Sequence, residues 1–214
     1  MSSRQVLLAF GFAFLLLFIL NVFVVKGDAV IWMNQNYSAG LNIVFKYITY
    51  LGDGIIFVPV ILVALFIRYE IAITAAMTGI LLAIITGVLK RQVFSDLSRP
   101  KSFFKDTYDL NFVDGVDVHS HFTFPSGHTA TAAAVALLLA LYIKKPIATA
   151  ILAFLAILVA ISRVYLAQHF WVDITYGFLT GMAITFLARW LCSGWLKNKS
   201  WAQKSLKSVF SARS

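Results

Sequence analysis

The sequence holds one cysteine, Cys192, among 214 residues. No intrachain disulfide can form, and a metal site built on cysteine ligands is excluded. Charged side chains are also scarce at 13%, and acidic residues number only nine. Soluble domains carry about 25% charged residues. The composition is therefore not that of a soluble globular protein.

Apolar residues are correspondingly abundant, at 60% of the chain with a mean hydropathy of +0.84. These values predict an all-α integral membrane protein with one membrane domain. The net charge of +9 would suggest a nucleic-acid partner only if it formed a surface stripe. The basic residues instead separate apolar segments, so we expect no nucleic-acid partner, and the sequence predicts no oligomeric state.

Six apolar segments are long enough to cross a bilayer as helices. They are Val6 to Val25, Leu51 to the residue before Arg68, Ile71 to Leu89, Ser126 to Ile143, Ile147 to Ser162, and Trp171 to Trp195. The first lacks the small-residue cleavage site of a signal peptide, so we interpret it as an uncleaved anchor. An amphipathic stretch before the second span predicts a helix in the membrane interface. Pro59 lies inside the second span and is a candidate kink.

Two polar segments interrupt or follow these spans. Residues 90–124 form a loop between the third and fourth spans that is too polar to cross a bilayer, and loops of this length are usually functional or disordered. Residues 1–196 make up the predicted membrane domain, and residues 197–214 a basic tail. The tail is interpreted either as a short helix on an anionic membrane surface or as a solvated segment.

Six spans place both termini on one side of the membrane. That side carries ten of the 18 Lys and Arg residues but only one of the nine acids, Glu70. The positive-inside rule makes this side cytoplasmic. All four histidines then fall on the outer side with Arg99, Arg163 and Asp173. We expect a periplasmic site in a bacterial inner membrane, although an endoplasmic reticulum enzyme with a lumenal site has the same topology.

A cation, an imidazole and a carboxylate lie together between the fifth and sixth spans. His169 and Asp173 are four residues apart and share one face if the segment is helical. The carboxylate could then hold one ring nitrogen and leave the other free to attack, with Arg163 holding an anion in front of it. An ordinary ion pair and a histidine at the membrane surface is an equally good interpretation of this stretch alone.

The segment Pro125-Ser126-Gly127-His128 opens the fourth span. Proline and serine mark a helix start, where free N–H groups and the helix dipole favour a phosphate. Gly127 allows close approach to the backbone, Ser126 can donate a hydrogen bond, and His128 can deliver a proton. The alternative is a serine cap beside an interfacial histidine.

Three stretches resemble the three signature motifs of the type 2 phosphatidic acid phosphatase superfamily. They are Arg99-Pro100, Pro125 to His128, and Ser162 to Asp173. That superfamily includes membrane lipid phosphatases and soluble vanadium haloperoxidases. The motifs cover roughly residues 90–173. The family lysine should precede Arg99 by seven residues, but Gln92 stands there. We expect Lys90 or Arg91 to take its place through a small insertion, with a slight preference for Lys90.

The resemblance implies roles for these residues and a metal-independent mechanism. His169 would attack phosphorus, Asp173 would orient it, and His128 would protonate the leaving group. The implied phosphate ligands are Arg99, Arg163, Ser126, Gly127, and Lys90 or Arg91. No cofactor is expected. Asp114, Asp117, His119 and His121 are a weaker alternative as a metal site, and a solvated or head-group-facing loop is favoured instead.

The substrate implied is a lipid that carries phosphate at the outer interface. Phosphatidic acid, phosphatidylglycerophosphate, undecaprenyl diphosphate and lipid A all qualify, and the sequence does not separate them. Two other functions remain open, namely phosphoryl transfer to a second lipid and a non-catalytic membrane scaffold.

Overall fold

The computed structural model describes residues 1–211, which fold into helices joined by turns and loops, with no strand in that range. The all-α prediction is confirmed. Five of the predicted spans correspond to continuous helices, whose ends lie within three residues of those expected. These helices are α1 (Ser3–Phe23), α5 (Tyr69–Val88), α7 (Gly127–Ile143), α8 (Pro146–Tyr165) and α9 (Trp171–Leu196).

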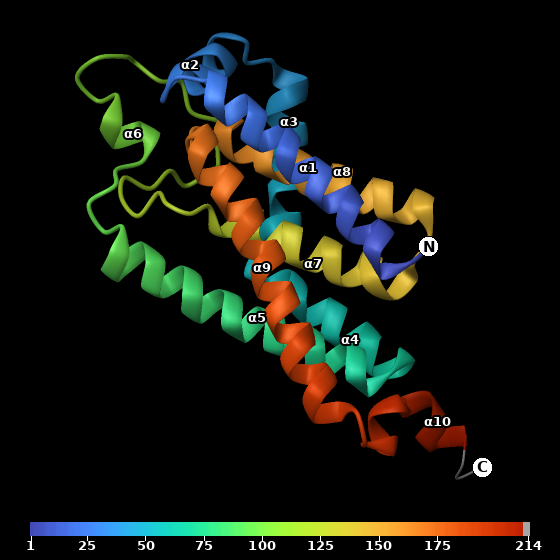
Figure 1. Ribbon diagram of the computed structural model, residues 1–214. Coiled ribbons are helices and arrows are strands. Elements are labelled where there is room, and N and C mark those ends of the chain that lie inside the picture. Colours follow the sequence, from blue (N-terminus) through green and yellow to red (C-terminus); the bar gives the residue numbers. More distant parts are fainter. Residues whose placement is uncertain (212–214) are drawn as a thin grey trace.

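Helix α7 lies at the centre of the bundle, in contact with α1, α5, α8 and α9 (Figure 1). Most of its residues are buried, and many of those are alanines. Small side chains allow helices to approach closely. At Gly181 of α9, an added Cβ would lie only 2.2 Å from the carbonyl oxygen of Ala130. The packing of α7 against α9 therefore depends on the absence of a side chain at that position.

The second predicted span is part of a broken pair of helices. Helix α3 (Ala39–Ile48) and a short turn (Thr49–Gly52) meet a second turn (Gly54–Ile56) and α4 (Phe57–Ile67) at 58°. Asp53 adopts an extended conformation there, and its Oδ1 accepts the N–H of Ile55 at 3.0 Å. The bend therefore lies at Asp53, not at Pro59, which occupies the first turn of α4, where its missing N–H is not needed.

The polar face of α3 packs inward. Asn42 accepts a hydrogen bond from the Tyr165 hydroxyl at 2.6 Å, and Lys46 donates to the carbonyl of Asp114 at 2.6 Å. Leu41, Ile43 and Val44 are exposed. The helix predicted for the interface thus directs Asn42 and Lys46 toward the protein and exposes three apolar side chains, while Phe45 packs inward against Tyr165.

The described chain has four helices long and apolar enough to cross a membrane, or five if the bent pair is one span. Helix α7 is apolar but shorter, at 17 residues. The outer surfaces of α1, α4, α5 and α8 expose large apolar side chains such as Phe12, Val63, Ile84 and Phe154. Apolar exposure on this scale is typical of a protein whose surroundings are lipid. Judged by helix length and composition, the described residues therefore do not show the six separate spans that the sequence predicts.

The N-terminus and the last described helix lie at one end of the bundle, and α2 (Asp28–Gln35) and α6 (Pro100–Phe103) lie at the other (Figure 1). Helix α2 was not predicted. The tail forms a turn (Ser200–Gln203) and helix α10 (Leu206–Ser211), and the carbonyl of Lys204 accepts the N–H of Tyr69 at 2.9 Å. The predicted tail also includes residues 212–214, which lie outside the described residues.

Candidate active site

Segments far apart in sequence meet around a chamber of about 380 Å³ at the end of the bundle that carries α2 and α6. We call it the phosphate chamber. Its wall includes Lys90, Arg99, His128, Arg163 and His169. The convergence expected from topology is therefore present in the fold.

His169 and Asp173 are both almost fully buried at the junction of α8 and α9. One oxygen of Asp173, Oδ2, lies 3.3 Å from Nδ1 of His169 and accepts the backbone N–H of Phe170 at 2.8 Å. The contact with Nδ1 leaves Nε2 as the nitrogen free for chemistry. A carboxylate in this position can fix the imidazole tautomer and stabilise positive charge on the ring.

Thr123 is a third member of this group that the sequence reasoning missed. Its hydroxyl donates to Oδ2 of Asp173, and its oxygen lies 3.3 Å from Nδ1 of His169. The N–H of Ser126 also donates to the carbonyl of Asp173, at 3.0 Å. The start of α7 is therefore tied to the first turn of α9. A lone threonine in a polar loop carries no sequence signal that could have identified it.

Ser126 acts as the N-cap of α7. Its side chain is fully buried, and its Oγ accepts hydrogen bonds from the N–H and the hydroxyl of Thr129. Gly127 and His128, but not Ser126, line the cavities around the site. The observed contacts fit the capping interpretation of Ser126, and its contact with phosphate stays a prediction.

Two guanidinium groups are buried in the wall of the phosphate chamber. Arg99 donates from Nε to the carbonyl of His121 at 2.9 Å and from Nη1 to Oε1 of Gln168 at 2.8 Å. Arg163 donates from Nη1 to Oγ1 of Thr49 at 2.6 Å, and its buried Nε has no partner. Within residues 1–211 neither forms an ion pair with a carboxylate.

Unpaired buried charge is costly, and arginines are rarely buried without a counter-charge. Two such groups line one chamber with His169, and the Nε of Arg163 has no hydrogen-bond partner, so this wall favours the binding of an anion. The planar fork of arginine suits the oxygens of a phosphoryl group. Gln168 and Thr49 hold the forks in place, and neither was predicted from the sequence.

Lys90 and Arg91 lie in a single π-helical turn, Leu89–Val93, that extends α5. Such turns insert one residue into a helix and are frequent at functional sites. Lys90 lines the phosphate chamber, and its Nζ lies 3.8 Å from where a Cβ on Gly127 would be. Arg91 is exposed and lines a neighbouring cavity instead. Of the two residues, Lys90 therefore has the position expected of the family lysine.

The cations and the burial affect the pKa of the central histidine. Burial is the largest cause that holds the pKa of His169 well below its ordinary 6.5, followed by the positive charges of Arg99, Lys90 and Arg163. Burial likewise lowers the pKa of Arg99, and the Asp173 carboxylate opposes that shift. His169 is therefore neutral at pH 7, the state in which Nε2 can act as a nucleophile.

The acidic and histidine residues of the long loop do not form one cluster. Asp117 and His119 line the phosphate chamber, whereas Asp114 is exposed and its carbonyl binds Lys46. Within the described chain, no three His, Cys, Asp or Glu side chains are placed together as metal ligands would be. The loop instead helps to position Arg99, because its partner Gln168 donates to the carbonyl of Asp117 at 2.9 Å.

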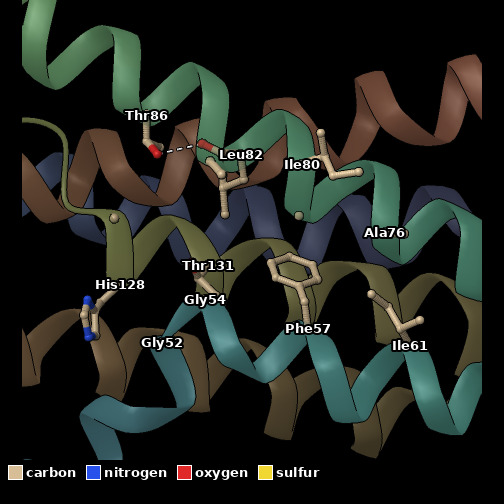
Figure 2. A pocket seen from close by; sticks show the side chains of 13 residues that line it. Gly52, Gly54, Phe57, Ile61, Ala76, Ile80, Leu82, Thr86, His128 and Thr131 are labelled. Carbon is tan, nitrogen blue, oxygen red and sulfur yellow. Dashed lines mark hydrogen bonds between the residues drawn. The ribbon is translucent and has the colours of Figure 1, made fainter.

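An apolar groove of about 610 Å³ runs between α4 and α5 and reaches the site. Figure 2 shows Phe57 and Ile61 on α4 facing Leu82 and Ile80 on α5, with His128 at one end of the groove. The groove thus leads from the lipid-facing side of two helices to the histidine at the start of α7.

The profile of the PAP2 superfamily matches residues 70–197, more than half of the chain. An undecaprenyl-diphosphatase from Sulfolobus acidocaldarius is 31% identical over an alignment of 161 positions, which covers 73% of this chain and 73% of that protein. Phosphatidylglycerophosphatase B from Bacillus subtilis is 38% identical over an alignment of 79 positions, which covers 33% of this chain and 39% of that protein.

Two solved structures share the fold. LpxE from Aquifex aeolicus superposes with a TM-score of 0.67 at 25% identity, covering 77% of this chain and 94% of that one. A transmembrane PAP2 type phosphatidylglycerolphosphate phosphatase from Bacillus subtilis gives 0.55 at 26% identity, covering 93% and 98%. The family match, the named phosphatases among the relatives and the shared fold agree with the motifs, and the chain belongs to the PAP2 superfamily as a membrane phosphatase that hydrolyses phosphoric esters.

Proposed function

We propose that the protein hydrolyses the phosphate monoester or diphosphate of a membrane lipid through a phosphohistidine at His169. The observation that carries the proposal is the pair of buried, carboxylate-free guanidiniums of Arg99 and Arg163 in the wall that also holds His169. They supply the positive charge that a transferring phosphoryl group needs, and they are held in place before the substrate arrives.

In the first step, Nε2 of His169 attacks phosphorus and the P–O bond to the lipid breaks. The Asp173 carboxylate stabilises the ring as its charge rises, and His128 gives a proton to the departing oxygen. Arg99, Arg163 and Lys90 neutralise the equatorial oxygens. In the second step, His128 takes a proton from water as that water attacks phosphorus. Inorganic phosphate leaves and His169 is restored, so the mechanism requires no metal.

The lipid part of the substrate has a suitable path. The groove between α4 and α5 is lined almost entirely by apolar side chains and ends at His128, where the leaving oxygen must be protonated. A chain held in this groove would enter from the bilayer without crossing water. This supports a lipid phosphate rather than a soluble phosphate ester as substrate.

For the arrangement in the membrane, we infer six spans, counting the bent pair α3–α4 as one and including α7. Helix α7 is surrounded by the other helices and needs no lipid-facing length of its own. Arg68 and Arg189 stack on Tyr142 at the end of the bundle that holds the N-terminus and α10. We therefore infer a plasma-membrane protein of a bacterial type with cytoplasmic termini and the site at the outer face.

Phosphate release from purified protein in detergent tests the proposal, with phosphatidic acid, phosphatidylglycerophosphate and polyprenyl diphosphates as substrates. We expect activity that is lost in His169→Ala and a phosphoprotein that is labile in acid and stable in alkali. A second lipid added as acceptor distinguishes hydrolysis from phosphoryl transfer by its products. Full turnover by His169→Ala would overturn the mechanism, and no turnover by the native protein on any substrate would favour the scaffold.

A further inference from the structure

A second cavity, of about 500 Å³, adjoins the phosphate chamber. We call it the side chamber. It shares Lys90, Arg99 and His119 with the phosphate chamber, so the two have a common wall. It shares Gly127 with the apolar groove. The side chamber therefore lies where the phosphate site and the lipid path meet.

The lining of the side chamber carries charge of one sign. It includes Lys90, Arg91 and Arg99, and the imidazoles of His119 and His121, but no carboxylate. Among residues 1–211, Arg91 takes part in no ion pair. A concave surface with several cations and no acid focuses a positive potential and attracts anions. The mechanism proposed above uses Lys90 and Arg99 but has no task for Arg91, His119 or His121.

The geometry of this lining is set by the backbone. The π-helical turn is closed by the N–H of Phe94, which donates to the carbonyl of Leu89 at 2.8 Å. The turn allows Lys90 and Arg91, adjacent in sequence, to line the same cavity. On the opposite side, the N–H of Arg99 donates to the carbonyl of Ser120 at 2.9 Å. That bond holds the segment between His119 and His121 against the wall.

The direction of the reaction decides what the side chamber can hold. The leaving group must depart on the side of phosphorus opposite His169, toward His128. Gly127, the neighbour of His128, borders both the side chamber and the groove. A leaving group that bears its own phosphate can therefore place that phosphate in the side chamber and its chain in the groove. Phosphatidic acid has no second phosphate to place there.

We propose that the side chamber is a second anion-binding subsite, which binds a phosphate belonging to the leaving group and makes the enzyme prefer lipids with two phosphates. This rests on the proposed phosphatase function. With a lipid diphosphate, the bond from the terminal phosphorus to the bridging oxygen breaks as the bond to Nε2 of His169 forms. The lipid monophosphate leaves with the electron pair and a proton from His128. Arg91 is the specificity-determining residue because it lines only this chamber.

The test compares substrates of the same apolar chains with and without a second phosphate. Farnesyl diphosphate is matched with farnesyl phosphate, and phosphatidylglycerophosphate with phosphatidic acid of the same acyl chains. We expect the native protein to favour the two-phosphate member of at least one pair in kcat/KM. The pair that shows the preference identifies whether the second phosphate comes from a diphosphate or from a phosphodiester.

Arg91→Gln should reduce that preference on the order of tenfold, because a hydrogen bond to a charged group is lost. Lys105→Gln is the matched control, since Lys105 is an exposed cation of the same outer loop that lines neither chamber. It should keep the native preference. Methylenediphosphonate, which cannot be hydrolysed, should compete more strongly than inorganic phosphate in the native protein and lose that advantage in Arg91→Gln.

Two outcomes separate the subsite from the function on which it rests. If every substrate is hydrolysed with no preference, or if Arg91→Gln slows both members of a pair equally, the subsite is wrong and the phosphatase stands. If no substrate is hydrolysed by the native protein, the proposed function itself fails. Size-exclusion chromatography in detergent provides the folding control. If Arg91→Gln elutes as the native protein does, misfolding does not explain its change in substrate preference.

Discussion

Nη1 of Arg163 donates a hydrogen bond to Oγ1 of Thr49 at 2.6 Å, across 114 residues of sequence. Both side chains are buried, and Thr49 comes from the turn between α3 and α4, inside the broken helix pair. The break therefore has a structural consequence at the site. It turns the chain so that a hydroxyl, rather than another apolar side chain, meets a guanidinium of the phosphate chamber.

Thr49→Val should lower kcat/KM about tenfold to a hundredfold, because it removes a neutral partner of a buried charge at a cost of about 1.5 to 3 kcal/mol. Valine has nearly the shape of threonine, so the packing is kept. Phosphate release at subsaturating substrate measures the effect. Thr49→Ser restores the oxygen and should recover most of the activity. An equal loss in the serine and valine variants would contradict this role of the hydroxyl, because serine keeps it.

Gly52 and Gly54 flank the bend and provide a matched pair. A Cβ on Gly52 would lie 2.6 Å from the carbonyl oxygen of His128 and 2.7 Å from a methyl of Val159, whereas one on Gly54 would meet nothing within 4 Å. Gly52→Ala should therefore destabilise the protein by about 1 to 3 kcal/mol through overpacking. It should also displace His128.

Thermal unfolding in detergent and phosphate release measure both effects. Gly54→Ala should leave the unfolding midpoint and the rate close to native. If the two alanine variants behave alike, the close approach between the bend and α7 does not hold.

The sequence predicted the long helices and the convergence of the motifs well, for identifiable reasons. Apolar runs bounded by charge locate helices such as α8 and α9, and the four-residue spacing of His169 and Asp173 places both side chains near one another. The order of spans then brings Arg99 and His128 to the same end. These inferences need only the local periodicity of the sequence and the number of membrane crossings between two motifs. An even number of crossings places both motifs on the same side.

Thr49, Thr123 and Gln168 could not be predicted in the same way. Each lies in a turn or loop and reaches the site through a contact with a segment distant in sequence. Their positions depend on how the long loop and the broken pair pack, which no local pattern encodes. The sequence likewise made no prediction of which face of α3 packs inward, because amphipathicity does not tell which face meets lipid and which meets protein.

Thr123 is expected to act as a positioning residue through Asp173. Thr123→Val should lower kcat several-fold to about tenfold with little change in KM, since the lost hydrogen bond orients Asp173, the partner of the attacking histidine, rather than the substrate. Thr123→Ser should recover the rate. In Asp173→Asn the same threonine change should have a smaller effect, because the two residues act as a unit. Steady-state kinetics of the four variants test this, and strictly additive losses would contradict it.

The pH dependence should follow the lowered pKa of His169. The neutral ring is the nucleophile, so activity is present above that pKa and is lost as the pH falls through it. Because burial and the nearby cations hold the pKa well below 6.5, the acid limb of kcat/KM should lie below pH 6.5. A bound phosphate dianion offsets the cations, so the acid limb of kcat should lie at higher pH. Rate profiles in detergent test both limbs, and an acid limb of kcat/KM above 6.5 would be evidence that His169 is not the attacking group.

His128→Gln should separate the two chemical steps. With p-nitrophenyl phosphate the leaving phenolate needs no proton, so His169 can still be phosphorylated, whereas hydrolysis of the phosphohistidine still needs a base. We expect a burst of p-nitrophenol equal to the amount of enzyme, followed by a steady rate at least about a hundredfold below native. His128→Gln combined with His169→Ala should give no burst. A steady rate in His128→Gln equal to that of the native protein would show that another group activates the water, and the position of His128 at the end of the lipid groove would then serve binding rather than catalysis.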